Sequence, residues 1–171
     1  FFGEGSACQD IVDKRKEVIV KKGRKFNKVL VNKMRKAGIG SAATRVGAAT
    51  LGVLAAVNAV GDVVDLHGNW ISGGPTLEPP EAKGLRENTT LVTVATDASL
   101  SKSDLLRLII RSHDALAATL RPAHTRYDGD IVFAISCGEE EADMDLLGEV
   151  AFSATAAAIV SSVRDATSLA G

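Results

Sequence analysis

The order of apolar segments in the second half of the chain constrains the fold most. Residues 91–96 have the alternation and apolar bias of a strand, and residues 131–136 fit a second, buried strand. Between them, Ser101-Lys102-Ser103-Asp104 is a capping box, in which a hydroxyl and a carboxylate three residues later satisfy the first backbone N–H groups of a helix. We expect this helix to run to about Leu120, where Arg121-Pro122 ends it.

A last helix is expected over residues 143–168. Its alanine-rich part, residues 154–160, suits close packing against a sheet or another helix. Strands in the middle of the chain, with helices before, between and after them, predict a layered α/β arrangement.

The first half is expected to contribute further strands and helices. Residues 49–57 are an apolar run long enough for a strand buried on both faces, and residues 62–72 predict a hairpin that extends the sheet of this strand. Residues 6–20 have the spacing of an amphipathic helix, although Val18-Ile19-Val20 equally fits the start of a strand. Residues 21–36 predict a second helix, ended by Gly38-Ile39-Gly40-Ser41.

The length of 171 residues suffices for one domain. The longest apolar run considered, residues 48–60, is too short to cross a bilayer, so we expect a soluble protein. Cys8 and Cys137 are isolated thiols without metal-ligand spacing, which favours a reducing cytoplasm. The chain starts with Phe1 and has no signal-peptide layout, so we expect it to begin inside a longer protein.

Positive charge is concentrated near the N-terminus. Residues 1–48 hold 12 of the 20 Lys and Arg residues and four acidic residues, whereas the net charge of the whole chain is -1. Such a block can bind nucleic acid. With Phe26 as its one interleaved aromatic and no reader motif, the block favours a solvated helix face or a surface that meets another subunit over a nucleic-acid-binding surface.

Asn88-Thr89-Thr90 places a hydroxyl directly after an asparagine. The motif follows a Gly/Pro-rich connection, residues 73–88, and precedes the apolar strand at residues 91–96. If the Asn88-Thr89 bond were cut, Thr89 would carry its hydroxyl together with a free α-amino group, whose pKa near ~8 suits a built-in base. A polar turn entering a strand is the alternative interpretation.

Three other side chains are candidates for supporting groups. Asp128-Gly129-Asp130 puts two carboxylates before a strand, where at least one can hold a new N-terminal ammonium or orient a lysine, although the same motif is common in hairpin turns. Asn58, at the end of residues 49–57, can direct its amide at an oxyanion, or it can simply terminate the strand.

Several segments along the chain form one pattern. In order, they are Lys36-Ala37-Gly38-Ile39-Gly40-Ser41-Ala42, Val57-Asn58-Ala59-Val60-Gly61-Asp62-Val63-Val64-Asp65, Asn88-Thr89-Thr90, Val94-Ala95-Thr96-Asp97-Ala98, Ser112-His113-Asp114, Arg121-Pro122-Ala123-His124-Thr125, Tyr127-Asp128-Gly129-Asp130 and Val132-Phe133-Ala134. This pattern resembles the DmpA-like family of L-aminopeptidase/D-esterases, β-aminopeptidases and the nylon-oligomer hydrolase. The resemblance covers roughly residues 28 to 171, and its most specific parts are Asn-Thr-Thr and His-Thr-x-x-Asp-Gly-Asp.

The resemblance implies an αββα-type sandwich of the N-terminal-nucleophile kind, of which this chain is part. It also implies self-cleavage at Asn88-Thr89, with an α-type segment at residues 1–88 and a β-type segment at residues 89–171 that together form one domain. Thr89 would be the nucleophile and Asn58 would line the oxyanion site. Asp128 and Asp130 would support the nucleophile and its ammonium, and Lys28 would lie near the nucleophile.

The family pattern is incomplete in this chain. Lys21-Lys22-Gly23-Arg24-Lys25-Phe26 stands where the family has a Gly-rich segment, and the N-terminal half of the family is absent. A non-catalytic binding or assembly member of the same fold is therefore the second hypothesis. A nucleic-acid binder that uses residues 14–36 is the third hypothesis.

The leading hypothesis is an amidase or aminopeptidase that acts on a small peptide, amino-acid amide or ester. We expect homo-oligomers of αβ units, and we expect neither membrane nor nucleic-acid partners. No phosphate loop, metal cluster or dinucleotide fingerprint occurs in the sequence, so no cofactor is expected. His113 and His124 are interpreted as hydrogen-bonded structural residues and His67 as a turn residue.

Overall fold

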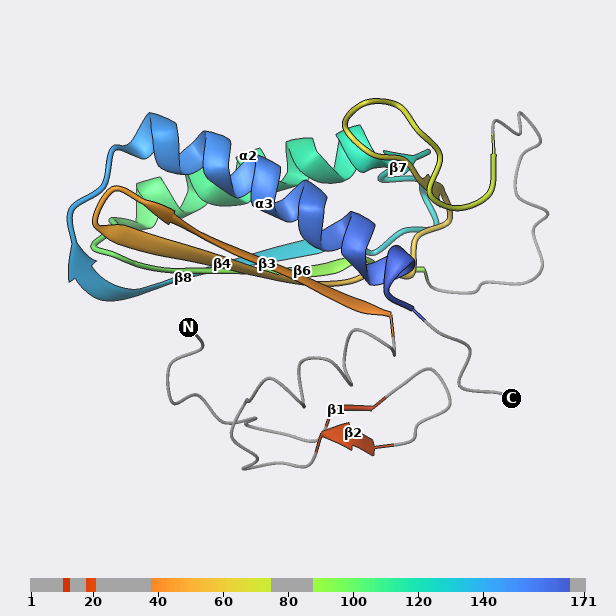
Figure 1. The fold of residues 1–171 in the computed structure, drawn as a ribbon, viewed down its shortest axis with the longest axis horizontal. Helices are drawn as coiled ribbons and strands as arrows, with labels where there is room; N and C mark the ends of the chain where they lie inside the picture. Colours follow the sequence, from red (N-terminus) through yellow and green to blue (C-terminus); the bar gives the residue numbers. More distant parts are fainter. Residues whose placement is uncertain (1–10, 13–17, 21–37, 75–87, 167–171) are drawn as a thin grey trace.

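The computed structural model describes residues 11–12, 18–20, 38–74 and 88–166. A four-stranded sheet carries two helices on one face (Figure 1). The strands, in spatial order, are β3 (Ile39–Val46), β4 (Ala49–Ala56), β6 (Leu91–Ala98) and β8 (Ile131–Glu140), and the helices are α2 (Lys102–Thr119) and α3 (Met144–Arg164). The expected layered α/β class is confirmed.

Two small strand pairs accompany this sheet. β1 (Ile11–Val12) pairs antiparallel with β2 (Val18–Val20), and β5 (Asp62–Val63) pairs antiparallel with β7 (Leu120–Arg121). The prediction of a helix over residues 6–20 is wrong at residues 11–12 and 18–20, which are strands. The alternative prediction of a strand at Val18-Ile19-Val20 is confirmed.

The direction of the strands decides which ends of the chain segments meet. β3 and β4 form an antiparallel hairpin around Gly47, whose φ of 63° lies in the left-handed region that glycine adopts without strain. β4 is antiparallel to β6, whereas β6 and β8 are parallel and joined through α2. The C-terminal end of β4 and the N-terminal ends of β6 and β8 therefore lie at the same end of the sheet.

The core lies between the sheet and the two helices. Alternate strand residues face the helices, such as Leu51 and Val53 on β4 and Val92 and Val94 on β6, and all are buried. The helices contribute Leu108 and Leu116 from α2 and Leu147 and Ile159 from α3, which are also fully buried. The helical spacing expected between residues 101 and 120 is thus confirmed, and Ser101 and Asp104 form both bonds of the capping box.

Helix α3 is a core helix. Its length and a mean hydropathy of 1.6 over its most apolar 18-residue window would suffice to cross a membrane, but half of that window is buried inside the fold. It packs against β3, β4 and α2. Among its alanines, Ala154, Ala156 and Ala158 are buried, as the expected packing role requires.

The opposite face of the sheet carries exposed apolar side chains. Leu91, Ile131, Phe133 and Ile135 are 40–51% exposed. The strands expected at residues 49–57 and 131–136 are present as β4 and β8. The prediction that both strands are buried on both faces is wrong for the part of the chain that the structure describes, since only the face toward the helices carries buried side chains. An αββα sandwich would cover this face with a second sheet.

Two further expectations need correction. Residues 39–46 form β3, a full strand, whereas the sequence predicts only the end of a helix there. The strand signal is weak because the segment contains small residues, of which Gly40 lies against the backbone of α3. The hairpin at residues 62–72 exists as a bridge between Val64 and Trp70, but it does not extend the main sheet, because β5 pairs with β7. The helix expected at residues 21–36 and most of the connection at residues 73–88 lie outside the described residues.

Candidate active site

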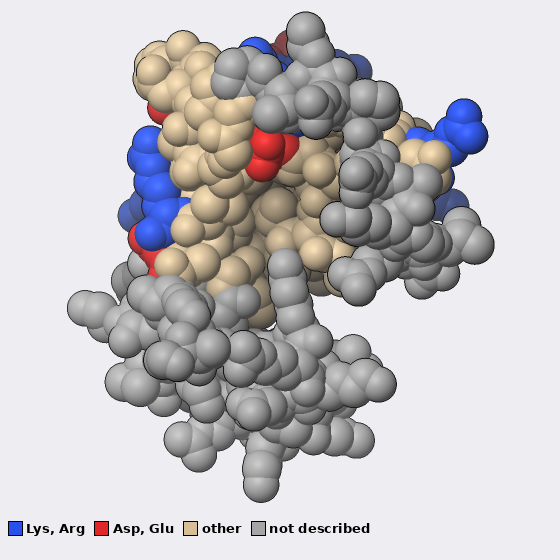
Figure 2. All heavy atoms as spheres, turned by 90° about the vertical axis from the view of Figure 1, so that its right-hand side faces the viewer, with Lys and Arg blue, Asp and Glu red and all other residues tan. Residues whose placement is uncertain are grey.

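Three predicted segments meet at one end of the sheet. Asn58 follows β4, Thr89 precedes β6, and Asp128 precedes β8, and the strand directions place all three at the same end. The register pairs Leu91 with both Ala56 and Ile131. Figure 2 faces this end of the molecule: the described surface is mostly uncharged, with acidic side chains near the middle, beside a hollow.

The backbone of the Asn-Thr-Thr motif is held at three successive N–H groups. The N–H of Asn88 donates to the carbonyl oxygen of Tyr127 at 3.2 Å, and the N–H of Thr89 donates to the carbonyl oxygen of Asn58 at 2.9 Å. The N–H of Thr90 donates to Oδ1 of Asp130 at 2.8 Å. The motif is therefore fixed by two other segments of the chain rather than by a local turn.

Two donors converge on the carbonyl oxygen of Asn88. The hydroxyl Oγ1 of Thr89 lies 2.7 Å from this oxygen, and the backbone N–H of Gly129 donates to it at a distance of 2.7 Å. A backbone N–H that points at a carbonyl oxygen can stabilise negative charge on that oxygen when a nucleophile attacks the carbonyl carbon. The hydroxyl of Thr89 is therefore next to an amide carbonyl that is already polarised.

Asp128 holds the surrounding loops together. Its Oδ1 accepts from the N–H of Val60 at 3.0 Å. Its Oδ2 accepts from the N–H of Thr125 at 2.9 Å and from the Thr125 hydroxyl at 2.6 Å. The carboxylate thus ties the segment after β4 to the turn before β8, which brings the carbonyl of Asn58 to Thr89.

Asp130 is buried beneath the motif. Its side chain is 2% exposed, and Oδ1 accepts from the N–H of Thr90 while Oδ2 lies 2.8 Å from Nδ1 of His124. The interpretation of His124 as a hydrogen-bonded histidine is confirmed.

The remaining predicted residues are Asn58, Lys28 and His67. Asn58 is exposed and meets Thr89 through its backbone carbonyl, so an oxyanion role for its side-chain amide stays a prediction. Lys28 and residues 21–26 lie outside the described residues. His67 is exposed in the turn that contains Gly68, as expected.

One contributor, Gly129, was missed from the sequence, whereas His113 was considered as a structural histidine. Gly129 was considered only as the centre of a turn, and its backbone N–H could be recognised only once β6 and β8 were known to be parallel. The ring of His113, from α2, lies 5.1 Å from the ring of His124. Burial, and secondly the electrostatic effect of the neighbouring His124, hold the pKa of His113 below its usual 6.5.

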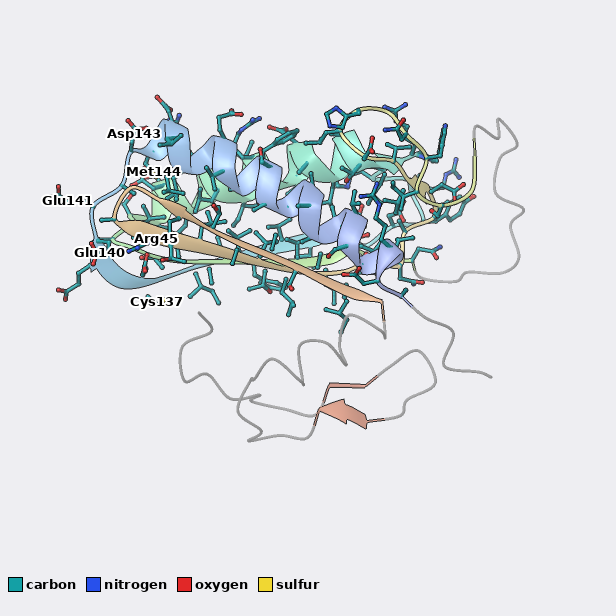
Figure 3. All side chains as sticks on the ribbon, in the orientation of Figure 1. Arg45, Cys137, Glu140, Glu141, Asp143 and Met144 are labelled. Carbon is teal, nitrogen blue, oxygen red and sulfur yellow. The ribbon has the colours of Figure 1, made fainter. Side chains whose placement is uncertain are left out.

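The far end of the molecule holds a different set of side chains. Figure 3 labels Cys137, Glu140 and Glu141 there, around the end of β8. Since the candidate site lies at the start of β8, Cys137 is remote from Thr89.

Comparisons with known proteins point in one direction. The sequence profile of peptidase family S58 matches residues 30–171. An uncharacterised aminopeptidase of Mycobacterium tuberculosis is 41% identical over a region that covers 60% of this chain and 36% of the relative. One from Mycobacterium leprae is 39% identical, and the match covers 63% of this chain and 34% of the relative. The chain thus spans about a third of the length of these relatives.

Solved structures share the fold. The L-aminopeptidase D-Ala-esterase/amidase of Ochrobactrum anthropi, described as a variant of the Ntn hydrolase fold, matches with a TM-score of 0.58 and 21% identity over 75% of this chain and 40% of that protein. A β-aminopeptidase of Burkholderia sp. matches with a TM-score of 0.50 and 24% identity over 78% of this chain and 42% of that protein.

Proposed function

The chain belongs to peptidase family S58, and from this membership we propose that it is a self-processing N-terminal-nucleophile hydrolase whose nucleophile is Thr89. The observation that carries the proposal is the pair of 2.7 Å contacts at the carbonyl oxygen of Asn88, one from Thr89 Oγ1 and one from the N–H of Gly129. The family membership supplies the class of chemistry, and these contacts support Asn88-Thr89 as the bond that would be cut.

Self-cleavage would proceed as an acyl shift. Thr89 Oγ1 attacks the carbonyl carbon of Asn88, and the N–H of Gly129 stabilises the negative charge on the carbonyl oxygen. The C–N bond breaks as the hydroxyl proton passes to the departing nitrogen of Thr89, which leaves an ester between Asn88 and the Thr89 side chain. Water then hydrolyses the ester, so that Asn88 ends in a carboxylate and Thr89 regains its hydroxyl beside the amino group that the acyl shift has already freed.

The mature site would reuse the same groups on a substrate. The α-amino group of Thr89 takes the hydroxyl proton as Oγ1 attacks an amide or ester carbonyl, and later returns a proton to the leaving group. The carbonyl of Asn58, which already accepts from the nitrogen of Thr89 at 2.9 Å, would hold the new ammonium. Asp128 and Asp130 would keep this arrangement in place, with Lys28 near the nucleophile and the amide of Asn58 at the oxyanion.

The substrate class and the assembly are parts of the same proposal. Small peptides, amino-acid amides and esters fit an aminopeptidase of this family. We also propose that the protein forms homo-oligomers of αβ units in the cytoplasm, without a cofactor or a membrane partner. The exposed apolar face of the sheet is available for the second sheet of the sandwich.

Intact-mass measurement tests the self-cleavage. We expect the purified chain to convert with time into pieces that span residues 1–88 and 89–171. Thr89→Ala should stay whole, whereas Thr89→Ser should be cut because it keeps a hydroxyl. Thr90→Val is the matched control, since it removes the neighbouring hydroxyl, and it should still be cut. A chain that stays whole, or a cut that persists in Thr89→Ala, would refute the proposal.

A hydrolysis assay separates the enzyme from a binding or assembly module. The cut protein should release the chromophore from a panel of L-, D- and β-aminoacyl p-nitroanilides and esters. Thr89→Ala, shown by circular dichroism to be folded, should release none. A cut and folded protein that is inactive on the whole panel would favour the binding module.

A further inference from the structure

His124 has no part in the acyl transfer described above, yet its surroundings connect it to Thr89. Its Nδ1 lies 2.8 Å from Asp130, whose other oxygen accepts from the N–H of Thr90. We propose that His124 is a positioning residue for the nucleophile: by donating to Asp130 it orients the carboxylate that fixes Thr90, and thereby Thr89. The inference rests on the proposed function, because it takes Thr89 to be the nucleophile.

The burial of Asp130 makes its contact with His124 important. The side chain of Asp130 is 2% exposed, and each of its oxygens has one described partner, the N–H of Thr90 on Oδ1 and Nδ1 of His124 on Oδ2. An ionised carboxylate only accepts hydrogen bonds, so the shared hydrogen belongs to His124. Without this donor, a buried oxygen loses its partner, and the carboxylate would turn toward water and away from Thr90.

The position of Thr90 controls the position of Thr89. Thr90 is the residue between the nucleophile and the first residue of β6, and it is fully buried. The 2.7 Å contact between Thr89 Oγ1 and the carbonyl oxygen of Asn88 depends on the backbone on both sides of Thr89. A displacement of about 1 Å in such a geometry is enough to slow a reaction by roughly 100-fold.

The backbone of His124 gives independent support. Its φ is 52°, in the left-handed region that costs energy for a residue with a Cβ atom and that glycine or asparagine adopts more readily. A strained conformation at a non-glycine residue is consistent with a side chain that has to reach a particular place. The ring of His113 lies beside the ring of His124, with 5.1 Å between the ring centroids.

Three substitutions at His124 separate hydrogen bonding from backbone strain and from bulk. His124→Asn keeps a donor close to the position of Nδ1 and tolerates a positive φ. His124→Gly relieves the strain but has no donor, and His124→Gln places its donor farther along the side chain. His67→Asn, in an exposed turn, is the matched control.

The first measurement is the rate of self-cleavage after cell-free synthesis, followed by intact mass. We expect the Asn variant and the His67→Asn control to be cut at close to the rate of the unmodified chain. The Gly and Gln variants should be cut about 10- to 100-fold more slowly, the loss typical of a missing hydrogen bond to a charged group. Cleavage of the Gly variant at the unmodified rate would overturn the inference.

The second measurement does not depend on cleavage. In the Thr89→Ala background, His124→Gly should accelerate hydrogen exchange at the Thr90 amide, whereas His124→Asn and His67→Asn should not. Unchanged exchange in His124→Gly would overturn the inference even if the proposed function holds. If the unmodified chain is never cut, the proposed function fails, and the exchange at Thr90 still decides whether His124 holds Asp130 in place.

Discussion

Gly129 lies directly opposite Thr89 across two neighbouring segments. The parallel register that pairs Leu91 with Ile131 continues backward through the bridge between Asn88 and Asp128, so Thr89 and Gly129 face each other. This relationship delivers the N–H of Gly129 to the carbonyl of Asn88 at 2.7 Å. The same closeness leaves little room for a side chain at residue 129.

Gly129→Ala should therefore slow the proposed self-cleavage without unfolding the protein. A Cβ at this position would lie 3.0 Å from Thr89 Oγ1, which would push the hydroxyl or the Gly129 N–H away from the carbonyl of Asn88. We expect a reduction of about 10- to 100-fold, smaller than the roughly 100- to 1000-fold that the complete removal of an oxyanion donor costs, because the N–H is displaced rather than lost. Gly52→Ala is the matched control, because its Cβ would meet nothing within 4 Å. Equal cleavage rates for the two variants, followed by intact mass, would argue against the assigned donor.

Asp128→Asn should destabilise the loops around the site. The Asp128 carboxylate is the acceptor in all three hydrogen bonds that the structure gives it, and the donors belong to Val60 and Thr125. An asparagine must turn its NH2 group toward one of these donors, so we expect a loss of about 1–3 kcal/mol in the free energy of unfolding and slower cleavage. Urea unfolding monitored by circular dichroism measures the loss, with the exposed Glu141→Gln as control. Stability equal to that of the control would contradict the assigned contacts.

Gly40→Ala should weaken the packing of α3 on the sheet. A Cβ at residue 40 would collide with the backbone of Ala158 and Ser162 in α3, so the helix would have to move away. Overpacking of this kind costs about 1–3 kcal/mol. Gly52→Ala, on the neighbouring strand, should change the unfolding midpoint in urea much less. A Gly40→Ala variant as stable as Gly52→Ala would show that the contact between β3 and α3 is looser than described.

Thr90→Val should not destabilise the protein. The hydroxyl of Thr90 is fully buried, and no hydrogen-bond partner for it is found among the described residues. Replacing an unsatisfied hydroxyl by a methyl group is expected to be neutral or to stabilise by up to about 1 kcal/mol. Thr119→Val is the comparison, because the equally buried Thr119 hydroxyl donates to the carbonyl of Ala115 at 2.7 Å. Thermal unfolding should rank Thr90→Val above Thr119→Val; the reverse order would mean that the Thr90 hydroxyl has a partner.

His113 should make stability depend on pH below neutrality. Its pKa is held below the usual 6.5 by burial and then by the charge of His124, while Asp130 and Asp114 act in the opposite direction. As the pH falls below about 6.5, the unfolded chain therefore binds a proton that the folded chain does not, and stability decreases until the lowered pKa of His113 is passed. Urea midpoints between pH 7.5 and pH 5 should show this decrease.

Substitution isolates the contribution of His113. His113→Gln should flatten the decrease, whereas His67→Gln, in an exposed turn, should leave it unchanged. An identical pH dependence in the unmodified chain and in His113→Gln would exclude His113 as its source.

The elements with strong local signals were predictable from the sequence. The capping box at Ser101 and Asp104 marked the start of α2, the proline at residue 122 marked its end, and the apolar runs marked β4, β6 and β8. β3 was not predicted because Gly40, Ser41 and Ala42 have weak strand propensity. At Gly40 the absence of a side chain permits the close approach of α3.

The sequence also proposes Thr89 as the nucleophile, which stays a prediction, but it does not reveal the contacts around that residue. An asparagine followed by a threonine at the head of an apolar strand identified Thr89, and the Asp-Gly-Asp motif identified Asp128 and Asp130. What each carboxylate does depends on partners far away in the sequence. Asp128 binds Val60, and Asp130 binds Thr90 and His124, and these assignments required the fold.

The sequence by itself therefore determined the family, the layered α/β class and the hydroxyl that precedes β6, because local propensity and short motifs are written in neighbouring residues. The tertiary structure decided how these parts meet. The parallel pairing of β6 with β8 brought Gly129 opposite Thr89, and the antiparallel pairing of β4 with β6 brought Asn58 to the same end. Strand direction and register arise from packing across the whole sheet, which no short stretch of sequence specifies.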